Sequence, residues 1–180
     1  MVQFTDMKYI ILSLLFFTFF VIQLQGNIRI NSYNISIEIT PENKSIKAQA
    51  DIKLSVDPES LDSLVFYLHK EFSVVEIKSN VPISYIFRTD ERSAYFWMKD
   101  ACPLWIKLEN NNKENIDIQF VYHGPIRDLD WNTTNMISES WIELGGYSAW
   151  FPINPDYGKF IYNINLGIDQ SYKVTGMVKY

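Results

Sequence analysis

The stretch "YNISIEITPENKSIKAQADIKLSV", from Tyr33 to Val56, decides the fold class of this chain. Apolar and polar side chains alternate on both sides of the tetrapeptide "PENK". Successive side chains of a β-strand point to opposite faces, so this alternation is typical of strands with one buried face. Proline and asparagine suit the turn between them. The stretch therefore predicts a β-hairpin in an antiparallel sheet that has one face in water.

Short alternating or apolar runs continue along the chain after this hairpin. They cover residues 63–70, 72–79, 83–88, 94–99, 104–109, 115–124, 160–168 and 172–180. The runs 83–88 and 94–99 flank "TDERS" and predict a second hairpin. No amphipathic helix and no linker stands out. We therefore expect an all-β domain, an antiparallel β-sandwich or a curved, saddle-like sheet of about eight to ten strands.

The N-terminus has the pattern of an export signal. Lys8 precedes an apolar run from Tyr9 to Ile22, and polar residues follow up to Gly26. The run suits a signal-peptide core and is short for a membrane span, which takes about 20 residues. We predict a signal peptide at 1–26, or an uncleaved anchor through 9–22, and one domain at 27–180. The protein is then exported, and is extracellular, periplasmic or at the cell surface.

The residues that usually carry catalysis are scarce. His69 and His123 do not form the H-E-x-x-H zinc motif, and Cys102 has no histidine near it in the sequence. His69 is out of phase with Leu68, so we expect its side chain to face solvent. The formal net charge is −5 with no basic patch, which argues against a nucleic-acid partner. The residues present predict no catalytic site and no cofactor in this chain.

The segment "ESWIELGGYSAWFPINPDYGKF", from Glu139 to Phe160, is the least ordinary part of the sequence. Its aromatic residues include Trp141, Tyr147, Trp150, Phe151 and Tyr157. Three interpretations are open for this group. It forms a corner of the core, an exposed patch that docks another domain, or a platform on which sugar rings stack.

The order of these motifs resembles the N-terminal β-domain of aminopeptidase N-like zinc metallopeptidases, the gluzincins. That domain opens with "Y-x-I-x-I-x-I-x-P", a turn and a long second strand, as Tyr33 to Val56 do here. An "L-x-F-x-L" strand follows, here in "SLVFYLHKEFSVVEIKS", and later strands resemble "LWIKLE" and "IDIQFVYHGPI". The family then has a segment ending in Phe-Pro, here Phe151-Pro152, followed by a further strand. The resemblance covers residues 28–180.

The sequence also departs from the family pattern. Ser148-Ala149-Trp150 stands where the family has an arginine before Phe-Pro, and Ile153 stands in place of its cysteine. "NPDY" replaces the usual Asp-Glu-Pro. The result is closer to membrane-associated bacterial relatives with a "W-[FY]-P" version of the segment. These departures are typical of a divergent branch.

What the resemblance implies concerns Glu143. In the family the β-domain holds no zinc, and the zinc ligands lie in a following catalytic domain that this sequence does not contain. The β-domain contributes an acid or amide to the pocket for the free amine of the substrate, and the matching position is Glu143. A carboxylate there would pair with an ammonium group.

Two hypotheses follow. The first is a non-catalytic β-domain, truncated or stand-alone, that docks on a catalytic metallopeptidase domain and lines the substrate-amine end of its cleft. Zinc then belongs to that partner, and a peptide N-terminus is the group bound. The alternative is an exported surface-binding module for a glycan or a protein partner.

Overall fold

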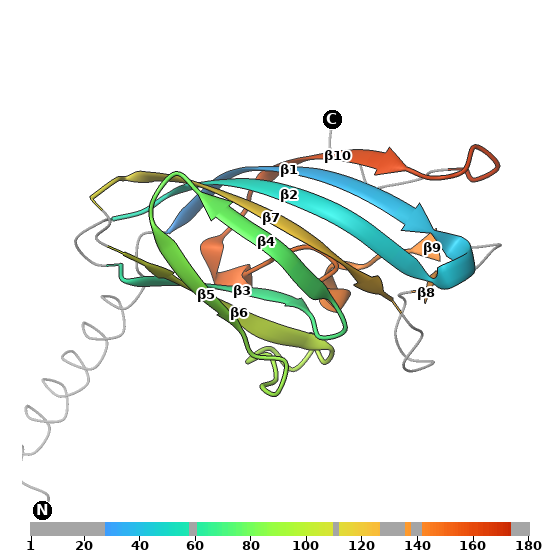
Figure 1. Ribbon diagram of the computed structural model, residues 1–180, viewed down its shortest axis with the longest axis horizontal. Helices are drawn as coiled ribbons and strands as arrows, with labels where there is room; N and C mark the ends of the chain where they lie inside the picture. Colours follow the sequence, from blue (N-terminus) through green and yellow to red (C-terminus); the bar gives the residue numbers. More distant parts are fainter. Residues whose placement is uncertain (1–27, 58–60, 110–111, 127–135, 138–141, 174–180) are drawn as a thin grey trace, which may run out of the picture.

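The computed structural model describes residues 28–57, 61–109, 112–126, 136–137 and 142–173. Figure 1 shows two β-sheets stacked against each other. The larger, sheet A, has the order β10-β1-β2-β7-β4, and the smaller, sheet B, has the order β3-β6-β5. Sheet A contains β1 (Arg29–Thr40), β2 (Ser45–Ser55), β4 (Ser73–Ser79), β7 (Asn115–Pro125) and β10 (Ile161–Gly167). Sheet B contains β3 (Ser63–His69), β5 (Ile83–Phe87) and β6 (Ala101–Leu108).

Short elements complete the described chain. They are a two-stranded ribbon of β8 (Met136–Ile137) and β9 (Ile142–Glu143), and the 3-10 turns η1 (Pro41–Asn43), η2 (Gly146–Ser148) and η3 (Pro155–Tyr157). No helix in the described part of the chain has both the length and the apolar character needed to cross a bilayer. The expectation of a signal peptide falls on residues 1–26, outside the described residues.

The β1–β2 hairpin forms as its alternation predicts. Its register pairs Ile35 with Ala50 and Ile37 with Ala48, so the apolar members of both strands share one face. Pro41 starts the connecting turn, and Lys44 closes it in the left-handed conformation with a φ of 49°. The amide of Lys44 donates to the carbonyl of Pro41 at 3.1 Å. Local sequence is therefore enough to specify this unit.

The core lies between the two sheets. Phe66 of β3 and Phe120 of β7 meet edge to face with ring centroids 5.2 Å apart, which joins sheet B to sheet A. Both rings are buried among the isoleucines and leucines of the inner faces. The predicted all-β sandwich with a strongly antiparallel arrangement is confirmed.

One pairing differs from the antiparallel expectation. β10 runs parallel to β1, with Ser32 opposite Ile161 and Glu38 opposite Gly167. A parallel pair cannot be made by a hairpin, and here most of the chain lies between the two strands. β10 reaches the edge of β1 only after the chain has run along β3 of sheet B, at residues 149–157.

The predicted hairpin of 83–88 with 94–99 is wrong. β5 pairs instead with β6, which places Ile86 opposite Trp105 and Phe87 opposite Leu104. Residues 94–99 form no strand. They make a tight turn in which the amide of Met98 donates to the carbonyl of Tyr95 at 3.0 Å. The turn is favoured over a strand because Tyr95 and Met98 make apolar contacts over sheet B, which an exposed hairpin would not give them.

Candidate functional site

The segment 149–157 lies along the outer edge of β3 and closes it. The amide of Tyr67 donates to the carbonyl of Ile153 at 2.7 Å, and the amide of Ile153 donates to the carbonyl of Tyr67 at 3.0 Å. The amide of His69 donates to the carbonyl of Ala149 at 3.0 Å. An edge strand offers unpaired amides and carbonyls to other chains, and this segment satisfies them within the molecule.

Side chains extend the same closure toward the start of β3. The Nδ2 amide of Asn154 donates to the carbonyl of Val65 at 2.9 Å, and the hydroxyl of Tyr157 accepts from the amide of Val65 at 2.9 Å. Asn154 Oδ1 also accepts from the amide of Asp156 at 2.9 Å, which caps η3. Asn154 therefore holds the strand edge and its own turn together.

Two tyrosines of sheet A hold the segment from the other side. The hydroxyl of Tyr33 donates to the carbonyl of Pro152 at 2.8 Å, and that of Tyr122 donates to the carbonyl of Trp150 at 3.1 Å. Both hydroxyls are buried, and their burial raises the pKa of each phenol well above its ordinary value. The segment is thus tied to both sheets, which fixes the path of the chain between β9 and β10.

The described members of the aromatic group singled out in the sequence do not lie together on the surface. Trp150 is 7% exposed, and Phe151 and Tyr157 are also buried in the core. Tyr147, in η2, is 46% exposed. Trp141 lies outside the described residues. Of the three interpretations, packing in the core is the one that fits the burial of Trp150, Phe151 and Tyr157.

The position of His69 differs from the solvent-facing expectation. Its side chain is buried, and Met98, Ala149 and Ile153 pack on the face of β3 that strand alternation assigns to water. Its Nδ1 accepts from the amide of Glu71 at 3.3 Å, and its ring lies 5.1 Å from that of Phe72. Burial lowers the pKa of His69 below its ordinary value, which favours the neutral imidazole.

Glu143 lies at the end of the β8–β9 ribbon, opposite Met136. Its side chain is exposed, whereas its neighbours Ile142 and Leu144 are half-buried and pack against the core. No ion pair involving Glu143 is found among the described residues. The carboxylate is therefore held at the margin of the domain and is accessible to a cationic group. A surface pair of this kind is weak by itself, so tight recognition needs further groups.

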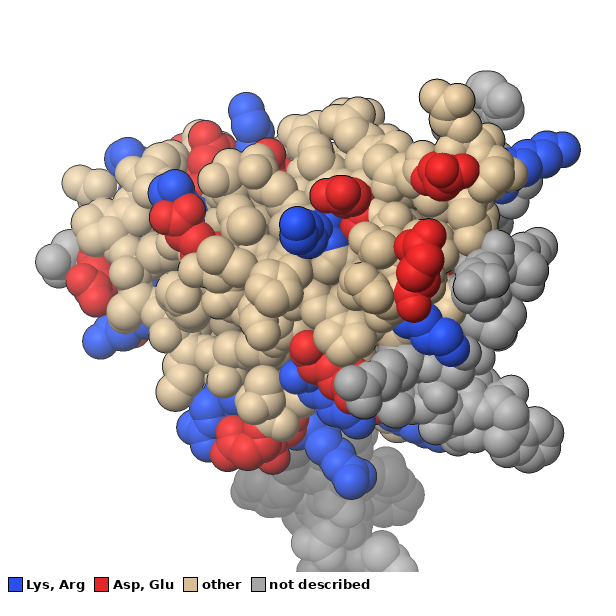
Figure 2. Space-filling view, turned by 45° about the vertical axis from the view of Figure 1, so that its right-hand side comes forward, with Lys and Arg blue, Asp and Glu red and all other residues tan. Residues whose placement is uncertain are grey.

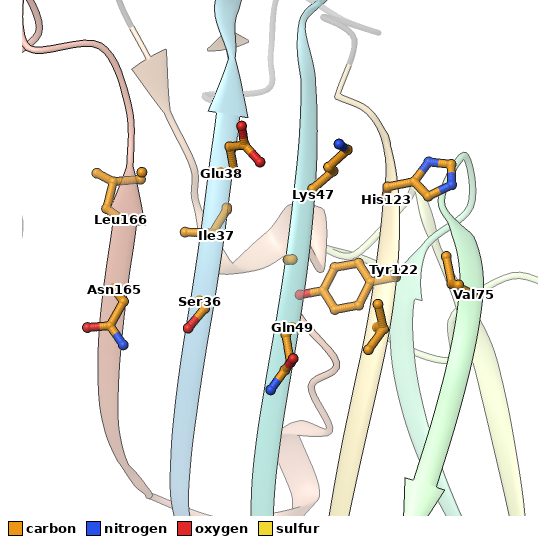
Figure 3. Close-up of a pocket in the computed structure, with 13 residues that line it drawn as sticks. Ser36, Ile37, Glu38, Lys47, Gln49, Val75, Tyr122, His123, Asn165 and Leu166 are labelled. Atoms are coloured by element: carbon orange, nitrogen blue, oxygen red, sulfur yellow. The ribbon is translucent and has the colours of Figure 1, made fainter.

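An open groove lies on the outer face of sheet A (Figure 3), with a volume of about 710 Å³. A cross-strand row of Glu38, Lys47 and His123 crosses it, in register on β1, β2 and β7. Val75 lines the groove at the bulge between Val74 and Glu76, an irregularity that the alternation of β4 does not reveal. Charged and polar side chains such as these are usual on a sheet face that is in contact with water.

Groups suited to nucleophilic or metal chemistry do not gather in the part of the chain that the structure describes. Cys102 is buried, and burial raises the pKa of its thiol, which disfavours the reactive thiolate. No cluster of three or more His, Cys, Asp or Glu residues suited to a metal ion occurs among these residues. The face of the molecule in Figure 2 carries acidic and basic side chains interspersed, without an extended area of one sign.

The outer strand β10 carries uncovered apolar side chains. All seven residues of this strand are exposed, and Ile161 is 74% exposed. Ile164 and Leu166 pair with Ile35 and Ile37 of β1, so they continue the inner face of sheet A, but they lie at its edge. β10 contains no charged residue, which leaves it without the usual protection of an edge strand.

Comparison with known proteins finds solved structures that are similar to part of this chain. No protein-family model matches the chain, and no curated protein matches its sequence. Yeast LTA4 hydrolase in complex with bestatin is similar over 54% of this chain and 14% of its own, with 11% sequence identity and a TM-score of 0.43. An M1 zinc metallopeptidase from Deinococcus radiodurans is similar over 56% of this chain and 20% of its own, with 12% identity and a TM-score of 0.41.

A mutant of the Deinococcus radiodurans enzyme, bound to a Tyr-Ser-Ala substrate, is similar over 61% of this chain and 23% of its own, with 13% identity and a TM-score of 0.41. These proteins are M1 zinc metallopeptidases. They are the family that the sequence motifs resemble. The present chain spans between 14% and 23% of the lengths of these solved chains.

Proposed function

We propose that this protein is a non-catalytic β-domain that docks on a catalytic metallopeptidase domain and lines the end of the cleft that receives the amine of the substrate. The uncovered apolar strand β10 carries the proposal. Exposed isoleucine and leucine side chains on an uncharged sheet edge are typical of a surface that another protein covers.

The motif order supports the identity of the partner. The segments that resemble the metallopeptidase β-domain correspond to successive elements: the β1–β2 hairpin, β3 with β4, β6, β7, and the segment before β10. Glu143 precedes that segment and is exposed. Residues 149–157 follow Glu143 closely in the chain, and hydrogen bonds attach them to both sheets.

The first test is the coding sequence beyond the codon of Tyr180, or in a neighbouring gene. We expect a catalytic domain with an H-E-x-x-H motif. The two parts are then produced together and their association is measured. Ile164→Asp places a charge on β10 and should weaken association at least tenfold, whereas Lys53→Glu, on the outer face of sheet A, should leave it unchanged. Equal association of both variants with the partner would contradict docking through β10.

The second test addresses Glu143. In the assembled enzyme, Glu143→Gln removes a charge-assisted hydrogen bond to the substrate ammonium, so KM for a free-amine substrate should rise roughly tenfold to a hundredfold. N-acylated substrates lack the charge and should show no such change. Glu38→Gln, on the outer face of sheet A, is the matched control. Peptidase turnover by the 180-residue chain alone, lost in Glu143→Gln, would overturn the non-catalytic assignment.

A further inference from the structure

The turn at residues 95–98 presents two large aromatic side chains to solvent. Phe96 and Trp97 occupy its central positions, between the carbonyl of Tyr95 and the amide of Met98, which are joined at 3.0 Å. Phe96 is 89% exposed and Trp97 is 39% exposed. Turn centres usually hold Gly, Pro, Asn, Asp or Ser, which need no burial. Two aromatic residues at this position are therefore not explained by the turn itself.

The base of this turn is firmly anchored. Met98 is fully buried in a small cluster with Tyr67, Ala101 and Ala149 on the outer face of sheet B. The ring of Tyr95 packs edge to face on that of Tyr67 at 5.3 Å. The amide of Ser93 donates to the carbonyl of Ala101 at 2.9 Å. Phe96 and Trp97 are thus held outward by a packed base.

The adjoining outer face of sheet B is also apolar. Trp105 of β6 and Ile86 of β5 are opposite each other in register, and both are exposed. Leu104 and Ile106, which flank Trp105, point into the core, so Trp105 faces outward on the same side as Tyr67 and Ala101. Figure 1 shows the connection between β5 and β6 on this side, away from sheet A. One side of the sandwich therefore carries Phe96, Trp97, Trp105 and Ile86.

Three exposed cations on this side lie outside its ion pairs. Arg88 binds Asp90 at 3.2 Å and Glu91 at 2.8 Å, and Lys70 binds Asp100 at 2.6 Å, so each acid of the β5–β6 connection has a cationic partner. Three further exposed cations of this side, by contrast, form no ion pair among the described residues. They are Arg92, Lys99 and Lys107.

We propose that the outer face of sheet B binds the surface of an anionic lipid bilayer. The amphipathic ring of Trp97 and the apolar ring of Phe96 enter the interfacial layer, and Arg92, Lys99 and Lys107 meet the lipid phosphates. A protruding pair of aromatics flanked by unpaired cations fits a soft, negatively charged surface. The apolar run from Tyr9 to Ile22, predicted above to be a signal-peptide core or an uncleaved anchor, would bring this domain close to a membrane.

The test uses the full chain with phosphatidylcholine vesicles, with and without phosphatidylglycerol. Because the run 9–22 can itself attach the chain to vesicles, the readout is local. An environment-sensitive fluorophore is placed at Phe96→Cys, in a Cys102→Ala background, and at Ile161→Cys on β10 as the matched exposed control. We expect a blue shift and quenching by lipid-borne quenchers at position 96 only. A probe at position 96 that stays water-like, or an equal shift at both positions, would overturn the proposal.

The electrostatic part has its own test. Each cation near an anionic membrane favours binding by about fivefold, so Arg92→Glu combined with Lys99→Glu should lower insertion of the position-96 probe into anionic vesicles by well over tenfold. Lys53→Glu, on the opposite sheet, should leave it unchanged. Added salt should weaken insertion of the unsubstituted surface. Insertion that ignores both the double charge reversal and salt would contradict headgroup binding. Thermal unfolding of each variant confirms that the fold is retained.

Discussion

At the scale of single residues, buried hydroxyls hold the segment 149–157 in place. Tyr122→Phe keeps the ring but removes the donor to the carbonyl of Trp150, which stays buried without that partner. We expect the free energy of unfolding to fall by about 1–3 kcal/mol. Urea denaturation measures it, with Tyr85→Phe, an exposed tyrosine of β5, as the control. Equal stabilities of the two variants would show that the Tyr122 hydroxyl contributes nothing.

His69 shows at the same scale why sequence could not give the whole answer. Alternation along β3 places it correctly opposite Leu68, but alternation cannot tell whether the second face is covered. Ala149 and Ile153, which pack on that face beside Tyr67, lie far away in the sequence. The strand predicted at 94–99 is wrong for a different reason. Tyr95 and Met98 are apolar because they anchor a turn, not because they belong to a strand.

At the scale of elements, β3 behaves as an interior strand although it lies at the edge of sheet B. Its amides at Val65, Tyr67 and His69 all donate to residues 149–157. We expect their hydrogen exchange to be as slow as that of central β7, measured by NMR. Asn154→Ala should cost about 1–2 kcal/mol and speed exchange at Val65 first. Asn163→Ala, which removes an exposed contact to Asn34, is the control.

The close approach of β7 to the turn after β3 requires glycine at position 124. A Cβ there would lie 2.7 Å from the carbonyl oxygen of Glu71 and 2.8 Å from Cδ1 of Phe72. Gly124→Ala should therefore lower the free energy of unfolding by about 1–3 kcal/mol through overpacking. Gly146→Ala meets nothing within 4 Å and should be near neutral, which calorimetry can compare. A tolerated Gly124→Ala would mean that the turn moves freely.

The hairpin of β1 and β2 and the parallel β1–β10 pair mark what sequence does and does not specify. The first has its turn and its register within one continuous stretch, so period and turn chemistry suffice. The second depends on which edge remains free after the other strands have paired. The exposed Glu143 was assigned by resemblance, and the membrane-facing turn at 95–98 gave no signal because its apolar run matched that of a strand.

At the scale of the whole molecule, buried tyrosines make stability depend on alkaline pH. Burial raises the pKa of Tyr33 and Tyr122 well above the ordinary value and that of Tyr157 to about 12. In the unfolded chain these phenols lose their protons near a pH of about 10, so above it the unfolded state binds fewer protons than the folded one. Stability should be full below about pH 10 and fall as the pH rises toward 12.

Absorbance of the tyrosinate ion, followed together with circular dichroism, checks this expectation. Tyr33, Tyr122 and Tyr157 should ionise only as the circular dichroism signal of the sheets is lost. Ionisation of these three phenols near the ordinary tyrosine pKa, with circular dichroism unchanged, would show that water reaches them in the native state.

The closure of β3 by residues 149–157 also sets the order in which the protein can be completed during synthesis. Chains grow from the N-terminus, so Val65, Tyr67 and His69 leave the ribosome long before the residues that satisfy them. Until Tyr157 has been made, sheet B has an open edge that can recruit another nascent chain. A nascent chain that stalls before this point is thus a candidate for aggregation, and chaperones that bind exposed strands would be needed most in that interval.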